Sequence, residues 1–160
     1  MRLTNRSTFW LVLVVVAVTL AGGAYAAPQT SDRTAAKRTI HLREASPTPK
    51  LKVVDIGDPG VSAGDHVVTV DGVLDEHGDR AGSMSQVCTI LSPGENVFTS
   101  TYDCSGSFDL ADGSITVQGT FVPTAESSTL AITGGTGRFA KARGEVVLAT
   151  EADTITIDLA

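Results

Sequence analysis

From residue 65 onward the sequence consists of short runs with the period-two pattern of β-strands, separated by turn residues. The clearest run covers residues 115–121, where Ile115, Val117 and Phe121 alternate with polar residues. Such alternation places apolar side chains on one face of a strand and polar side chains on the other. No run in this region has the period of a helix, so we expect an all-β domain.

Eight strands are expected, joined mainly by turns that are rich in Gly, Pro, Asp and Ser. They cover residues 39–44, 66–74, 83–91, 97–108, 115–121, 129–133, 145–150 and 154–159. Pro47 and Pro49 prevent regular pairing after the first strand and predict a loop as far as Gly64, in which residues 51–56 lie extended against the core. Short connections make consecutive strands antiparallel. We favour an eight-stranded antiparallel β-barrel over a sandwich, because closure removes exposed edges.

The interior of such a barrel is the expected place for function, because it holds either packed side chains or one small ligand. Cys88 shares a strand face with Met84, and Cys104 shares one with Phe98 and Tyr102. We expect Met84, Phe98 and Tyr102 to contact a ligand there. For Tyr102 the alternative is a core residue whose hydroxyl is satisfied locally.

The two cysteines, Cys88 and Cys104, are expected to form a disulfide, as pairs of cysteines in small exported domains commonly do. They lie on either side of the Pro93-Gly94 turn at unequal distances from it. A bulge or a longer loop is therefore needed to bring them opposite one another. The alternative is one reactive thiol with an unrelated buried cysteine.

The N-terminus has the three parts of a secretory signal peptide. Arg2 and Arg6 precede an apolar run at residues 9–20, and Ala24-Tyr25-Ala26 is a small-x-small cleavage site. The apolar run is shorter than the roughly 18–20 residues that span a bilayer, so we favour cleavage after residue 26 over a membrane anchor.

The rest of the chain is expected to be a flexible tether, residues 27–38, and a single β-barrel domain, residues 39–160. We expect the mature protein to be secreted, extracellular and without membrane contact after cleavage. The chain has a formal net charge of −6 at pH 7 and no basic cluster. This charge argues against nucleic acid or anionic lipid as a partner.

A glycine-rich stretch at residues 130–144, LAITGGTGRFAKARG, predicts a strand, a tight turn and another strand. Gly134, Gly135 and Gly137 supply backbone angles with positive φ, which allow a sharp reversal. The stretch lacks the third glycine and the following helix of a dinucleotide-binding fingerprint, so phosphate binding is not expected.

Motifs for metal or covalent chemistry are not recognised in the sequence. His41, His66 and His77 have no ligand spacing, and the acidic residues within 71–79 do not follow the register of a calcium loop. The sequence also has no nucleophile elbow. We therefore expect no metal and no cofactor.

Two ordered motifs carry a family resemblance. DGSITVQGTF, residues 112–121, followed by LAITGGTGRFAKARGEVVL, residues 130–148, resembles the allene oxide cyclase family and its relatives, the dirigent proteins. The resemblance covers residues 65–148. It implies an eight-stranded barrel, often a homotrimer, whose interior binds an apolar small molecule. Allene oxide cyclase closes an unsaturated fatty-acid epoxide into a cyclopentenone, and dirigent proteins steer the coupling of phenoxy radicals.

The resemblance also implies roles for individual residues. The polar pair of the plant cyclase, a glutamate and an asparagine, falls on Glu44 and Ser46, so these are the predicted catalytic residues although the amide is lost. A pocket cysteine falls on Cys88, which has no free thiol if it is bridged to Cys104. Arg143 belongs to a dirigent-like pattern at the barrel mouth. It is expected to bind a ligand carboxylate or, alternatively, to tie the glycine turn to backbone carbonyls.

Three functions follow from these features. The leading one is an exported barrel that binds an apolar small molecule and isomerises or cyclises it, with Glu44 stabilising developing charge. The second is a non-catalytic carrier of a lipid-like ligand. The third is a structural secreted barrel filled by its own side chains, in which Glu44 is merely a solvated residue at a strand end.

Overall fold

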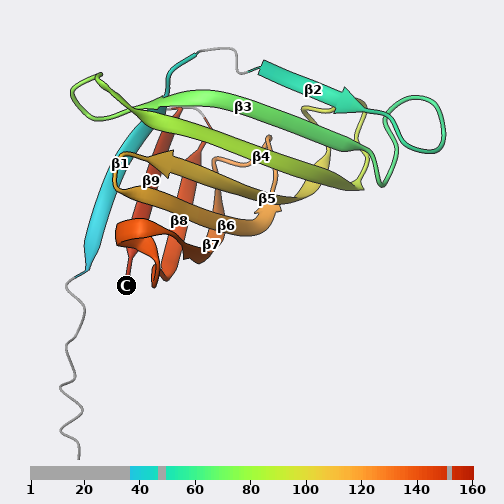
Figure 1. Cartoon of the computed structure of the whole chain (residues 1–160). Helices are drawn as coiled ribbons and strands as arrows, with labels where there is room; N and C mark the ends of the chain where they lie inside the picture. Colours follow the sequence, from blue (N-terminus) through green and yellow to red (C-terminus); the bar gives the residue numbers. More distant parts are fainter. Residues whose placement is uncertain (1–36, 47–49, 151–152) are drawn as a thin grey trace, which may run out of the picture. The chain divides into compact units, whose positions relative to one another are not determined.

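The computed structural model describes residues 37–46, 50–150 and 153–160, and in it one antiparallel sheet closes on itself (Figure 1). The strands are β1 (Arg38–Glu44), β2 (Lys50–Val54), β3 (His66–Leu74), β4 (Arg80–Ser92), β5 (Thr101–Leu110), β6 (Gly113–Phe121), β7 (Ser127–Gly135), β8 (Gly144–Ala149) and β9 (Thr154–Leu159). Consecutive strands pair from β3 to β9, and β1 pairs with both β9 and β3. The predicted eight-stranded antiparallel barrel is confirmed, with β2 as an additional strand.

The ninth strand, β2, lies on the same edge of β3 as the end of β1. Glu44 is paired with Val73, whereas Lys50 is paired with Val70 further along β3. The expected loop up to Gly64 is therefore wrong in its first part, because the alternating Lys-Leu-Lys-Val sequence forms a regular ladder with β3. Pro47 and Pro49, on which that expectation rested, lie outside the described residues, as do the predicted signal peptide and nearly all of the tether.

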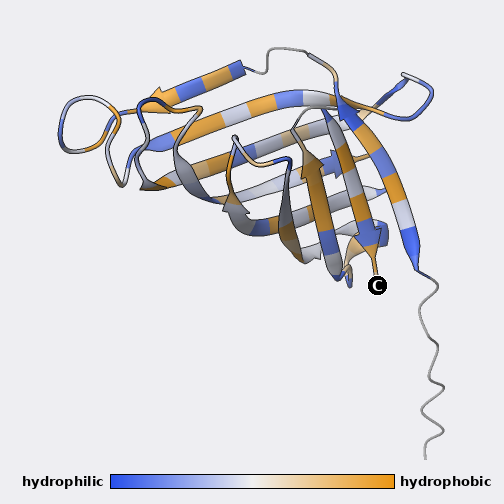
Figure 2. Cartoon of the chain, turned by 180° about the vertical axis from the view of Figure 1, so that it is seen from behind, coloured by the Kyte–Doolittle hydropathy of each residue, from blue (hydrophilic) through white to orange (hydrophobic). Residues whose placement is uncertain are grey.

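Buried and more exposed residues alternate along most of β7 and β9, and Figure 2 shows hydropathy changing from residue to residue along the strands. The inward positions of neighbouring strands lie opposite one another; Val117, for example, is paired with Ile132 and Leu130 with Val146. These side chains are almost completely buried. The period-two pattern of the sequence thus becomes one continuous apolar core.

One end of the barrel is covered by a single turn of 3-10 helix, η1 (Gly137–Phe139), whose Phe139 is buried. The predicted tight turn is wrong here: β7 continues through Gly134 and Gly135, and the chain returns only at Gly144. The glycines permit close packing, since a Cβ atom on Gly135 would lie 2.3 Å from the carbonyl oxygen of Ser114. Only Gly137 of the three has a positive φ, of 56°.

The connection between β4 and β5 is longer than predicted. The expected strand at residues 97–108 begins only at Thr101, because the side chains of Asn96 and Ser100 stabilise the preceding loop. The Asn96 Oδ1 atom accepts a hydrogen bond of 2.8 Å from the backbone N–H of Phe98. The Ser100 Oγ atom donates one of 2.9 Å to the carbonyl of Asn96. Such local hydrogen bonds compete with strand pairing.

The longer loop and a register shift between Ile90 and Ser92 place Cys88 opposite Cys104. The two sulfur atoms are 2.07 Å apart and form a disulfide. Both cysteines are buried, with 3% and 1% of their surface exposed. The question left open by the sequence is therefore answered in favour of the bridge.

Removing this disulfide is expected to destabilise the barrel. The bridge closes a loop with a sequence separation of 16, for which the loss of unfolded-state constraint costs about 3 kcal/mol. We expect the double variant Cys88→Ala/Cys104→Ala to lose about that much free energy of unfolding in urea titrations. Alkylation of the unfolded but unreduced wild type should leave its mass unchanged. Two alkylated thiols in that sample would contradict the bridge.

Two adjacent glycines of β7 provide a matched test of close packing. Gly135→Ala would push a Cβ atom against two backbone carbonyl oxygens, those of Ser114 and Phe139, and is expected to cost about 1–3 kcal/mol of stability. Gly134→Ala is the control, because its Cβ atom would meet only the Thr116 hydroxyl at 3.6 Å. Equal urea midpoints for the two variants would show that the close approach at Gly135 is unimportant.

Candidate functional site

The barrel interior contains two adjoining cavities, here named the main cavity and the side cavity. The main cavity has a volume of about 300 Å³ and the side cavity about 180 Å³. Glu44, Gln86, Phe98 and Phe121 line both of them. The other walls are mostly apolar, so the interior has the character of a small-molecule site rather than of a fully packed core.

Exposed residues mark the mouth of the main cavity. Phe98 retains 66% of its surface in contact with solvent and lies in the loop between β4 and β5. Thr150 and Asp153, from the connection between β8 and β9, are exposed as well. The buried part of the wall includes Met84, from the middle of β4. Met84 and Phe98, both predicted to contact a ligand, therefore lie in the same cavity.

Glu44 ends β1 and is half-buried at the point where the two cavities meet. Its backbone N–H donates a hydrogen bond of 3.3 Å to the carbonyl of Asp153, which places two carboxyl groups near each other. Burial raises the pKa of Glu44 above its ordinary value of 4.5, and the charges of Asp153 and Asp71 raise it further. A carboxyl group of this kind holds its proton to higher pH and can donate or accept it.

Gln86 is a polar residue of the cavity for which the sequence analysis gave no role. It occupies an inward position of β4, opposite Thr69 on β3 and Gly106 on β5. No residue of the described ranges hydrogen-bonds its carboxamide, and the same holds for the carboxyl group of Glu44. Both groups are therefore available to a ligand. A long polar side chain at an inward position of a period-two run is the signal that indicates Gln86.

Tyr102, the third residue predicted to contact a ligand, lines the side cavity and is buried. Its hydroxyl donates a hydrogen bond to the carbonyl of Val97. Burial raises the pKa of Tyr102, and a hydrogen bond with Ser100 opposes this shift. The hydroxyl is thus engaged locally, and the ring is the part of Tyr102 that faces the cavity.

Ser46, predicted with Glu44 as a catalytic residue, is half-buried, and its backbone N–H donates a hydrogen bond of 3.3 Å to Asp71 Oδ2. It does not line either cavity in the part of the chain that the structure describes. Of the two predicted catalytic residues, the structure brings only Glu44 into the interior wall. Ser46 instead contacts, through its backbone, Asp71, one of the carboxyl groups whose charge raises the pKa of Glu44.

Arg143 lies at the opposite end of the barrel from the mouth. It is exposed, directly precedes β8, and donates a hydrogen bond of 2.6 Å from Nη1 to the carbonyl of Ala142. Leu148 and Ala149, at the other end of β8, line the main cavity, so Arg143 is separated from the mouth by about 20 Å of strand. The structure does not bring Arg143 together with the other predicted ligand-binding residues.

The carboxyl group of Asp65, which is fully buried, has a structural role. It accepts hydrogen bonds of 2.7 Å from the backbone N–H groups of Ile56 and Ser62 and so fixes the loop between β2 and β3. These bonds lower the pKa of Asp65. The pKa of Asp65 is lowered because the protein stabilises its charge by hydrogen bonds, whereas the pKa of Glu44 is raised because burial disfavours its charge and nothing comparable among the described residues stabilises it.

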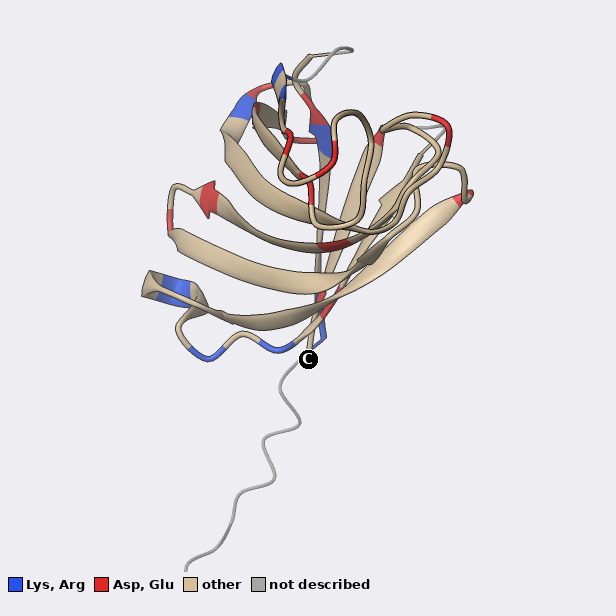
Figure 3. Ribbon diagram, turned by 90° about the vertical axis from the view of Figure 1, so that its right-hand side faces the viewer, with Lys and Arg blue, Asp and Glu red and all other residues tan. Residues whose placement is uncertain are grey.

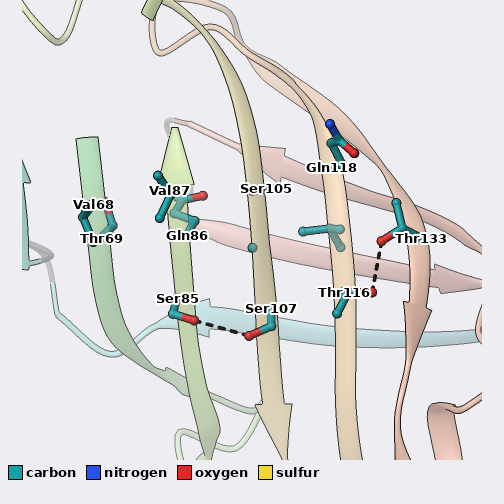
Figure 4. Close-up of a pocket in the computed structure, with 12 residues that line it drawn as sticks. Val68, Thr69, Ser85, Gln86, Val87, Ser105, Ser107, Thr116, Gln118 and Thr133 are labelled. Carbon is teal, nitrogen blue, oxygen red and sulfur yellow. Dashed lines mark hydrogen bonds between the residues drawn. The ribbon is translucent and has the colours of Figure 1, made fainter. Parts of the chain in front are cut away.

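A shallow hollow also lies on the outer surface, over β3 to β7, and its lining is drawn in Figure 4. Its hydroxyl groups hydrogen-bond one another, Ser85 with Ser107 at 3.3 Å and Thr133 with Thr116 at 3.0 Å. No ionisable side chain lines it. It therefore offers neither an enclosed volume nor an acid–base group, and the interior is the better candidate site.

No group of three or more His, Cys, Asp or Glu side chains among the described residues is arranged to hold a metal ion. None of the described helical segments has the length and apolar character needed to cross a bilayer.

Known structures with the same fold include several small-molecule enzymes. A pyocyanin demethylase superposes with a TM-score of 0.59 and 24% sequence identity, over 78% of this chain and 98% of that chain. A pterocarpan synthase dirigent protein gives 0.55 and 16%, over 77% and 84%. A Diels-Alderase from Streptomyces koyangensis gives 0.52 and 16%, over 77% and 61%. At these identities the similarity shows the fold alone.

Sequence comparison gives the family. No curated protein sequence matches the chain. A family model, that of the allene oxide cyclase barrel like domain, matches residues 39–158, which include all nine strands except the first residue of β1 and the last of β9. The motifs at residues 112–121 and 130–148 lie within that match. The chain therefore belongs to the allene oxide cyclase barrel-like family.

Proposed function

We propose that the barrel binds an apolar small molecule in its interior and isomerises or cyclises it, with Glu44 as the acid–base group. The observation that carries this proposal is the pairing of apolar walls with two polar side chains, Glu44 and Gln86, that have no hydrogen-bond partner among the described residues. The polar atoms of both side chains remain accessible to water, whereas a barrel filled by its own side chains would be expected to have apolar residues at these inward positions. The two cavities also argue against the filled, purely structural barrel.

The geometry suggests a division of labour. The apolar walls hold a flexible substrate in one reactive conformation, which lowers the entropic part of the barrier. Gln86 orients a polar atom of the substrate by hydrogen bonding. Glu44, whose pKa is raised by burial and by its acidic neighbours, transfers a proton to or from that atom, or stabilises the charge that develops there. An isomerisation or cyclisation of this kind conserves all atoms of the substrate.

The structural neighbours support a catalytic role, since a demethylase, a pterocarpan synthase and a Diels-Alderase all use this fold. The non-catalytic carrier is the second candidate, and one observation favours it. Of the polar positions that the family resemblance indicates, Ser46 is outside the cavity wall and Cys88 is bridged, so only Glu44 offers a reactive group.

The disulfide supports the proposal that the protein is exported, because such bridges persist in oxidising compartments.

Loss of Glu44 tests catalysis directly. The wild type is expected to change the product ratio and stereochemistry when incubated with a panel of unsaturated epoxides and reactive polyenes, and Glu44→Gln to lose most of that effect, about 10²-fold or more in rate. Glu145→Gln is the matched control, because it removes the same charge from an exposed position on β8. Product mixtures identical to buffer for all three proteins would support the carrier instead.

The raised pKa of Glu44 predicts a pH-dependent difference in stability. A carboxyl group with a raised folded-state pKa stabilises the fold while protonated, and this contribution is lost as pH rises from its unfolded-state value of about 4.5 through the folded-state value. The free energy of unfolding of Glu44→Gln, relative to that of the wild type, should therefore increase as the pH is raised from 4 to 7. Urea titrations at both pH values measure the difference. A gap that is independent of pH would show that Glu44 titrates normally.

A further inference from the structure

The charges around the two cavities have only one sign. Glu44 and Asp153 line the main cavity, and Asp71 acts on Glu44 from β3. No lysine, arginine or histidine lines either cavity among the residues that the structure describes. In addition, none of the salt bridges that the described residues form involves these three carboxyl groups. Asp71 accepts hydrogen bonds from the backbone N–H groups of Ser46 and Gly72, but no cationic side chain of the described residues is paired with any of the three carboxyl groups.

The basic side chains among the described residues do not line the cavities. Figure 3 shows lysine and arginine at the strand ends and loops, away from the middle of the long strands. At the far end of the barrel Arg138 pairs with Asp112 at 3.2 Å, and Arg38 lies over the ring of Phe139 at 6.0 Å. Lys50 and Lys52 are opposite Val70 and Val68, on the outer face of β2. None of these four basic residues lines the main or the side cavity.

Aromatic side chains provide the remaining part of the recognition surface. Phe98 and Phe121 line both cavities, Phe108 lines the main cavity and Tyr102 the side cavity. Aromatic ring faces attract cations and pack well against flat apolar groups. A wall of aromatic rings beside carboxylates that lack a cationic partner among the described residues is the arrangement that recognises an organic cation.

We propose that the natural ligand is an apolar organic cation, a hydrophobic skeleton that carries a protonated or quaternary nitrogen, with that nitrogen placed between Glu44 and Asp153. This rests on the proposed function, namely that the interior binds a small molecule. An acid, such as the fatty-acid epoxide of the plant cyclase, would add a further negative charge to the three carboxyl groups. In a site partly shielded from water that repulsion is strong.

The proposal also couples binding to protonation. A cation beside Glu44 stabilises the ionised carboxylate and opposes the effects of burial, Asp153 and Asp71. Binding of the cation therefore releases a proton from Glu44, and the affinity for the cation rises with pH through the titration of this group. A neutral ligand of the same shape lacks this dependence. The difference distinguishes charge recognition from simple hydrophobic binding.

Three probes that share the naphthalen-2-ylmethyl skeleton test the proposal by calorimetry with the full-length protein. They carry a trimethylammonium, a hydroxyl or a carboxylate group. In the wild type at low salt we expect the order cation, alcohol, acid, with about tenfold or more between the first and the last. Glu44→Gln and Asp153→Asn should each weaken the cation several-fold and leave the alcohol within twofold, and Glu44→Gln should also flatten the pH dependence. Glu145→Gln should leave all three affinities unchanged.

The outcomes separate this inference from the function on which it rests. Binding of the alcohol with no preference for the cation, or with the acid bound most tightly, would overturn charge recognition while leaving a ligand site in the interior. A cation preference that is unchanged in both Glu44→Gln and Asp153→Asn would also overturn it. Absence of binding for all three probes at millimolar concentration would remove both the inference and the proposed function.

Discussion

The structure depends on a short pairing between the first and third strands. Only two residue pairs, Arg43 with Leu74 and Glu44 with Val73, join β1 to β3, and a hydrogen bond of 2.9 Å from the Ala45 N–H to the Gly72 carbonyl extends them. Without these contacts the sheet would be open, with two long unpaired edges. Closure also decides the position of Glu44, because Val73 opposite it is fully buried and the two side chains share the inner face.

Most of the fold was predictable because the period-two pattern of apolar and polar residues recurs from strand to strand. The strands His66–Leu74 and Thr154–Leu159 have the predicted bounds, the first because it is rich in β-branched residues and the second because apolar and polar residues alternate along it. The errors occur where local hydrogen bonds of side chains, or close packing between strands, override this period-two pattern. Asn96 and Ser100 turn the chain before β5, and the glycines of β7 bring neighbouring strands close together rather than making a tight turn. Such effects need the register of the partner strand, which a single sequence does not contain.

The site was predictable in a different way. Glu44 came from the family resemblance, and Met84, Phe98 and Tyr102 from the strand faces that they were expected to share with the cysteines; all four line the cavities. Gln86 lies on the same face as Met84 and was missed, although a polar residue at an inward position is a visible exception to the pattern. The motif that contains Arg143 was recognisable in the sequence. The position of Arg143 was not, because only the direction and length of β8 show that it lies at the far end of the barrel.

The position of Glu44 has a cost for the fold, and this cost connects stability with binding. The carboxyl group is partly removed from water, close to Asp153 and Asp71, and it has no basic partner among the described residues. Each of these features disfavours its ionised form. An apolar residue opposite Val73 would continue the core and avoid the penalty. A bound cation would replace the missing partner and offset this penalty. The ionised form of Glu44, which is disfavoured without a ligand, would then be stabilised by binding, and the folded state with it.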